Sequence, residues 1–135
     1  MKNIIFGLMI AVVLQCACES EGKLYLPELS TYVATDVTGN SAGLHGYIRY
    51  GGTPAYTERG FICATKPNMS IYDSSDDSDT DYHKMVVQGT GKGEFSVNIT
   101  GLKANTTYYA RAYAKSYTGI SYANQISFKT TEDIP

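Results

Sequence analysis

The side chains best suited to binding a cation lie in one acidic stretch of the sequence, DSSDDSDTDYH. Asp77, Asp79 and Asp81 alternate there, as oxygen ligands do at the start of an EF-hand calcium loop. That loop also needs a glycine for its sharp turn and a bidentate glutamate at its end, and this chain has Tyr82 and Gln88 at those positions. We therefore predict a flexible acidic surface loop without a metal site, and the three aspartates stay as a weak alternative calcium site.

Groups that could perform catalysis are few. His45 and His83 are the only imidazoles, and neither lies in a sequence motif for a nucleophile or a metal ligand. Cys63 lies inside an apolar run, where a thiol is usually an inert core residue. We predict that the chain is not an enzyme and uses no cofactor.

The N-terminal segment has the pattern of an export signal. Lys2 precedes an apolar run of eleven residues, Ile4 to Leu14. A helix needs ~20 apolar residues to cross the ~30 Å hydrocarbon core of a bilayer, so this run is too short to span it. Its length is typical of a signal-peptide core, and we predict a signal peptide over residues 1–17.

Two cysteines follow the apolar run. Ala17 and Cys18 resemble a bacterial lipobox, in which cleavage leaves a lipid-modified cysteine as the first residue. Cys16, which follows Gln15, is the rival position, and an ordinary secretory signal with incidental cysteines is the other interpretation. The lipobox implies a cell-envelope protein anchored in the outer membrane by its lipid. The two glutamates after Cys18 resemble a surface-display signal, although a solvated linker explains them equally well.

Composition favours one β-rich domain. The 118 residues that remain after residue 17 (135 minus 17) can build one hydrophobic core but not two. Twelve tyrosines, no tryptophan and thirteen glycines predict short strands with frequent turns. The formal net charge of −2 and the lack of a basic cluster argue against binding to nucleic acid. We divide this part into a tether (18–28), a sandwich (29–131) and a tail (132–135).

The clearest strand pattern covers residues 108–115, where side chains alternate strictly between two faces. Tyr108 begins a face of alanines that we expect to point into the core. The other face carries an aromatic and basic row: Tyr109, Arg111, Tyr113 and Lys115. Leu102 and Tyr108, with a turn between them, match a tyrosine corner, in which the tyrosine hydroxyl bonds to the backbone just upstream.

Six further runs have a strand pattern and are separated by turn residues. The seven expected strands are 29–37, 42–50, 57–65, 84–88, 94–100, 108–115 and 120–129. The third is apolar on both faces, which predicts a central strand. The last has four residues on one face: Tyr122, Asn124, Ile126 and Phe128. Together these strands predict an all-β, seven-stranded Greek-key sandwich of the immunoglobulin type.

Four segments occur in a familiar order: TERGF at 57–61, GTGKGEFS at 89–96, TTYYARAYA at 106–114 and SFKT at 127–130. Through them, the chain from about residue 27 to 131 resembles the fibronectin type III-like module of lipoproteins from Bacteroides-type bacteria. The resemblance implies a β-sandwich that serves as a spacer or binding unit, and it brings no catalytic residues. The chain departs from the family pattern at Cys63, where an aromatic residue is common, and in its long acidic stretch.

Two functions are open for the sandwich. The first is a structural, protein-interaction or adhesion module with an unknown protein partner. The alternative is a glycan-binding module that uses an exposed row of Tyr109, Arg111 and Tyr113, because aromatic rings stack on sugars and a guanidinium binds hydroxyls. Cross-strand packing explains the same row without a ligand, contributing roughly 0.2–1 kcal/mol per pair, so we prefer the first function.

Overall fold

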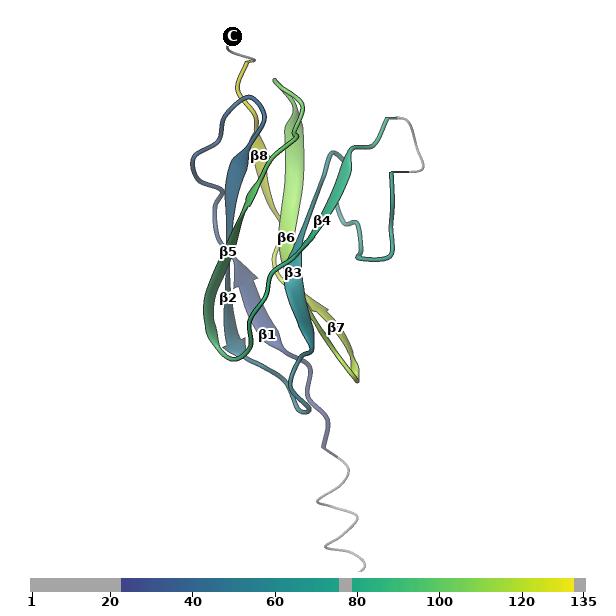
Figure 1. Cartoon of the computed structure of the whole chain (residues 1–135). Helices are drawn as coiled ribbons and strands as arrows, with labels where there is room; N and C mark the ends of the chain where they lie inside the picture. Colours follow the sequence, from purple (N-terminus) through teal and green to yellow (C-terminus); the bar gives the residue numbers. More distant parts are fainter. Residues whose placement is uncertain (1–22, 76–78, 133–135) are drawn as a thin grey trace, which may run out of the picture.

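The computed structural model describes residues 23–75 and 79–132, and all regular structure in these ranges is β-strand (Figure 1). The strands are β1 (Glu28–Thr31), β2 (Ala42–Tyr50), β3 (Glu58–Ala64), β4 (Tyr82–Val86), β5 (Gly93–Ile99), β6 (Thr107–Ser116), β7 (Gly119–Tyr122) and β8 (Ile126–Lys129). No helix in this part of the chain is long and apolar enough to cross a membrane. The predicted signal peptide, Cys16, Cys18 and Asp77 lie outside the described residues.

The strands form two antiparallel sheets that pack face to face. One sheet has three strands in the order β1-β2-β5. The other has five, in the order β4-β3-β6-β7, and β8 also pairs with β6. Figure 1 shows the two layers, with the long β3–β4 loop on the side of the five-stranded sheet. The prediction of an all-β, fibronectin type III-like sandwich is confirmed, with eight strands instead of seven.

The core lies between the two sheets and is built from alternate residues of the strands. Leu44 and Ile48 of β2 pack in one buried cluster with Phe61 of β3 and Phe95 of β5. The rings of Phe61 and Phe95 lie 5.0 Å apart. Cys63 belongs to the same cluster, and its burial raises the pKa of the thiol to about 12. The thiol therefore stays protonated and unreactive at neutral pH, as its apolar run predicted.

The strand predicted to be central is an inner strand, because β3 lies between β4 and β6. Gly60 permits the close pairing with β4, since a Cβ there would lie 1.9 Å from the carbonyl oxygen of Met85. Both faces of β3 are buried: Phe61 points into the main core, and Ile62 packs on the outer face with Ile71 and Tyr113. The outer face of this sheet therefore has a small core of its own.

The last predicted strand, 120–129, is divided into β7 and β8 by one extra residue. Tyr113 is opposite Tyr122, whereas Ala110 is opposite Ile126, so the register shifts by one between these pairs. A one-residue insertion moves the following side chains to the other face. Tyr122 accordingly lies on the outer face, while Ile126 and Phe128 pack against the main core. The prediction that these residues share one face was wrong.

A hydrogen-bonded clasp between Asn124 and the end of β1 lies at this shift. The backbone N–H of Thr31 donates to Asn124 Oδ1 at 2.8 Å, and Asn124 Nδ2 donates to the Thr31 carbonyl at 2.9 Å. The Thr31 hydroxyl accepts from the backbone N–H of Ala112 at 2.9 Å. The clasp joins β1 of one sheet to β6 and β7–β8 of the other, at the point where the last strand is broken.

Candidate functional site

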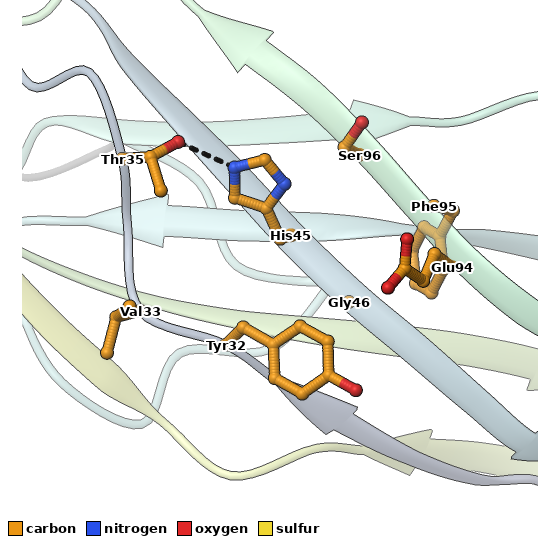
Figure 2. Close-up of a pocket in the computed structure, with 8 residues that line it drawn as sticks. All are labelled: Tyr32, Val33, Thr35, His45, Gly46, Glu94, Phe95 and Ser96. Carbon is orange, nitrogen blue, oxygen red and sulfur yellow. Dashed lines mark hydrogen bonds between the residues drawn. The ribbon is translucent and has the colours of Figure 1, made fainter.

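A hollow on the outer face of the three-stranded sheet has a volume of about 490 Å³. Its walls come from the segment after β1 and from β2 and β5, and we call it the β2–β5 hollow. It is lined by Tyr32, Val33, Thr35, His45, Gly46, Glu94, Phe95 and Ser96. Figure 2 shows the Tyr32 ring lying in front of β2, with the His45 ring above it and the Glu94 carboxylate to one side.

The segment after β1 forms one wall because it stays beside β2 without regular pairing. The predicted first strand, 29–37, ends at Thr31, but Tyr32 N–H still donates to the His45 carbonyl at 2.9 Å. Thr35 and Gly43 then exchange two backbone hydrogen bonds of 3.0 and 2.7 Å. Gly43 allows this approach, since a Cβ would lie 2.8 Å from Thr35 Oγ1.

The paired strands β2 and β5 supply the polar groups. His45 is opposite Ser96, and Gly46 is opposite Phe95, whose ring turns into the core. A Cβ on Gly46 would lie 2.9 Å from the Phe95 ring, so the missing side chain leaves room for that ring. Glu94 and Ser96 are exposed on the outer face of β5. The hollow thus has polar groups along β2 and β5 and apolar surface on its other wall.

One hydrogen bond between side chains joins the lining residues in Figure 2: Thr35 Oγ1 lies 2.6 Å from His45 Nε2. Ser96 is therefore not paired with the imidazole as a nucleophile would be with its base. Tyr32 and Val33 are 45% and 74% exposed, although both are large apolar residues. This arrangement can bind a complementary surface through an aromatic ring, an aliphatic side chain and a polar rim, but it contains no linked catalytic pair.

Tyr108 occupies the position expected of a tyrosine corner, and Leu102 is buried next to the turn. The Tyr108 hydroxyl accepts from the backbone N–H of Lys103 at 2.8 Å and donates to Asp81 Oδ2 at 2.6 Å. Burial and the hydrogen bond to Asp81 raise the pKa of Tyr108. The corner therefore also ties down the end of the β3–β4 loop, a contact that the sequence did not suggest.

The Asp81 carboxylate contacts the side chains of Tyr108 and His83. Partial burial raises the pKa of Asp81, but hydrogen bonds from Tyr108 and His83 outweigh this effect, and the net pKa is lowered. The Nε2 atom of His83 lies 2.9 Å from Asp81 Oδ2. Asp79 is exposed in the same loop. Within the two described ranges, no three His, Cys, Asp or Glu side chains gather as a metal site.

The row predicted to be an exposed binding face is partly covered. Tyr113 has no exposed surface, and its hydroxyl donates to Glu58 Oε2 at 2.7 Å. Arg111 donates from Nε to the Met69 carbonyl at 3.2 Å, and its guanidinium lies 4.1 Å from the centre of the Tyr122 ring. Tyr109 is half-buried. The expectation that Tyr113 belongs to an exposed row was therefore wrong, because Ile71 and Met69 of the β3–β4 loop pack against it, while Tyr109 and Arg111 keep partial exposure.

Sequence reasoning missed the covering loop and the hollow for the same reason. Alternation along a strand identifies two faces, but it does not say which distant segment covers one of them. A signal for the cover was present, since Met69 and Ile71 precede the acidic stretch and both pack on the outer cluster around Tyr113. No comparable signal marked the hollow, which combines three separate segments.

No protein-family model matches the sequence, and no curated protein matches it. Solved structures do resemble the fold. The solution structure of the sensor domain of the anti-sigma factor RsgI4 from Pseudobacteroides cellulosolvens has a TM-score of 0.52 and 17% identity, covering 79% of this chain and 76% of that one. A second structure of that sensor domain has a TM-score of 0.50 and 17% identity, covering 78% of this chain and 95% of that one. The likeness is one of fold.

A fibronectin type III domain from the human KIAA0970 protein is also similar, with a TM-score of 0.49 and 16% identity over 82% of this chain and 78% of that one.

Proposed function

We propose that this chain is a cell-envelope lipoprotein whose single sandwich is a protein-interaction or adhesion module. The observation that carries the proposal is the exposure of two large side chains at the β2–β5 hollow. Tyr32 and Val33 are 45% and 74% exposed there. Protein interfaces commonly combine such an aromatic and apolar centre with a polar rim, and His45, Glu94 and Ser96 supply that rim.

The N-terminal sequence supports the envelope location. An apolar run of signal-peptide length precedes Cys18, and Cys18 lies five positions before the first described residue, Lys23. A lipid on Cys18 would hold the sandwich close to the outer membrane and leave the hollow free for a partner. We take the partner to be a protein, because the hollow presents an exposed aromatic ring and an exposed aliphatic side chain, Tyr32 and Val33, beside a polar rim.

Site-specific photo-crosslinking in cells tests the interaction. A photo-crosslinking amino acid at position 33 should give discrete crosslinked species, because Val33 is 74% exposed at the hollow. Position 129, exposed on β8, is the matched control and should not give the same species. Adding Glu94→Lys to the Val33 probe should remove them. Equal crosslinking from both positions, or none from position 33, would leave a structural spacer as the better description.

Mass spectrometry of the mature N-terminus tests the anchor. We expect acylated Cys18 as the first residue, and Cys18→Ala should give unprocessed or soluble protein, since roughly two or three acyl chains stabilise attachment by ~0.8 kcal/mol per buried CH₂. Cys16→Ala is the control and should change neither processing nor attachment. An acylated Cys16 would move the start by two residues, and an unmodified N-terminus would remove the membrane from the proposal.

A further inference from the structure

One end of the sandwich carries exposed apolar side chains and is the end at which the described chain begins. We call this group the anchor-proximal patch; it consists of Leu24, Tyr25, Leu26 and Tyr117. Tyr117, in the β6–β7 turn, is 91% exposed. In Figure 1 the patch is at the lower end, where the start of the described chain, the β2–β3 turn and the β6–β7 turn lie together.

The patch is held in place by the fold. Tyr25 and Thr53 exchange two backbone hydrogen bonds, of 3.0 and 2.8 Å, which pin the entering chain to the β2–β3 turn. Leu26 reaches the β6–β7 hairpin, because a Cβ on Gly119 would lie 3.3 Å from Leu26 Cδ2. The Tyr25 ring packs edge-on to Tyr50, with 6.5 Å between ring centres. The exposed side chains therefore form a surface of the domain and are not a frayed terminus.

We propose that the anchor-proximal patch is a lipid-binding surface that rests in the headgroup region of the membrane. The inference rests on the proposed acylation of Cys18. Six positions separate Cys18 from Leu24, so at most ~20 Å of chain connects an acylated Cys18 to the patch. Tyrosine suits this interface, because its ring is apolar and its hydroxyl remains hydrated, and leucine adds apolar surface.

The short connection to Cys18 favours a membrane over a protein as the occupant, whereas the charge in the sequence around the patch is mixed, with Lys23 between Glu19, Glu21 and the exposed Glu28. Lys23, next to the patch, is exposed and can approach lipid phosphates. The β3–β4 loop, whose described part carries Asp73 and Asp79, lies on the side of the sandwich and away from this end (Figure 1). Contact through this end would stand the sandwich upright, with the β2–β5 hollow facing sideways.

Tryptophan fluorescence of the full acylated chain in vesicles tests the proposal. The chain has no tryptophan, so one substitution gives an unambiguous signal. Tyr117→Trp places the probe in the patch at a highly exposed position. Thr131→Trp is the control at the opposite end, since the ten residues of β6 separate the two ends by ~30 Å at ~3.3 Å per residue. Tyr72→Trp, exposed on the β3–β4 loop, reports a sandwich lying on its side.

In vesicles of phosphatidylethanolamine and phosphatidylglycerol with brominated acyl chains, Tyr117→Trp should show blue-shifted and quenched emission. Thr131→Trp and Tyr72→Trp should show neither change. If mass spectrometry finds Cys18 acylated but Tyr117→Trp is not quenched, the patch does not bind lipid while the proposed anchor stands. Quenching of Tyr72→Trp in place of Tyr117→Trp also overturns the inference. If the chain is not acylated and does not bind the vesicles, both the proposed lipid anchor and the lipid-binding patch are overturned.

Discussion

The outer faces of the two sheets have the same alternating sequence pattern but differ in how far they are covered. On the five-stranded sheet, the β3–β4 loop buries Tyr113 and receives hydrogen bonds from Arg111 through the Met69 carbonyl. On the three-stranded sheet, His45 and Tyr47 remain partly exposed, and the segment after β1 forms only the wall of a hollow. Aromatic and basic side chains on a strand are therefore no guide to a binding face until the loops are placed.

The largest expected difference between the two faces is in stability. Tyr113→Ala should lower the free energy of unfolding by about 3–5 kcal/mol, because it removes a fully buried ring from the outer cluster and the hydrogen bond to Glu58. Tyr47→Ala, also on an outer face, should lower it by about 1 kcal/mol or less. Chemical denaturation of both variants measures the contrast, and equal midpoints would mean that the loop does not cover Tyr113 in solution.

Tyr108→Phe tests how much the β3–β4 loop contributes to stability, because the Tyr108 hydroxyl joins this loop to the core. The substitution keeps the ring but leaves the Lys103 N–H without its acceptor and removes the Tyr108 hydroxyl donor from Asp81. We expect a loss of about 1–3 kcal/mol in the free energy of unfolding. Tyr109→Phe, one residue along on the outer face, is the control and should unfold at the wild-type denaturant concentration.

Acid should weaken the covered face through Asp81. Its folded-state pKa lies below the ordinary value of 3.8, so folding favours the ionised carboxylate. The stability that it contributes is present above pH ~4, where the unfolded chain is ionised as well, and is lost as the pH falls through the folded-state pKa. Asp81→Asn should reduce this pH dependence in denaturation curves measured from pH 7 downwards. If Asp81→Asn loses as much stability at low pH as the wild type does, other carboxylates cause the pH dependence.

The smallest effect on stability should come from the hollow. Tyr32→Ala with Val33→Ala removes two exposed side chains, and we expect a change within about 0.5 kcal/mol for each. The same pair should abolish the crosslinks formed from a probe in the hollow, moved for this purpose to position 96. Retained crosslinks, or a large loss of stability, would mean that these side chains serve the fold and not a partner.

Much of the sandwich could be predicted because its signals are local. The alternation from Tyr108 onwards assigned the core face of β6 correctly, and the two apolar faces of β3 predicted an inner strand. Turn residues located most strands to within a few residues. These features depend on neighbours in the sequence, which alternation and turn chemistry report directly.

The features that could not be predicted depend on distant partners. The break between β7 and β8 lies where Asn124 binds Thr31, 93 positions earlier, and no pattern within 120–129 predicts it. The burial of Tyr113 depends on Ile71 folding back over its strand. The hollow exists only because β1 ends early and its continuation turns alongside β2. Each is a tertiary contact that overrides a correct local pattern.

The Asn124–Thr31 clasp has a mechanical consequence. A membrane anchor and a partner held at the hollow would both pull on the first sheet, one through Tyr25 and the other through the segment after β1. Without the clasp, that tension would be borne by the short pairing of β1 with β2. Because Thr31 is also bonded to Asn124 and to the Ala112 N–H, the load is shared with the second sheet at the point where β1 ends. The irregular segment between β7 and β8 would thus help a tethered domain to resist unfolding under a pulling force.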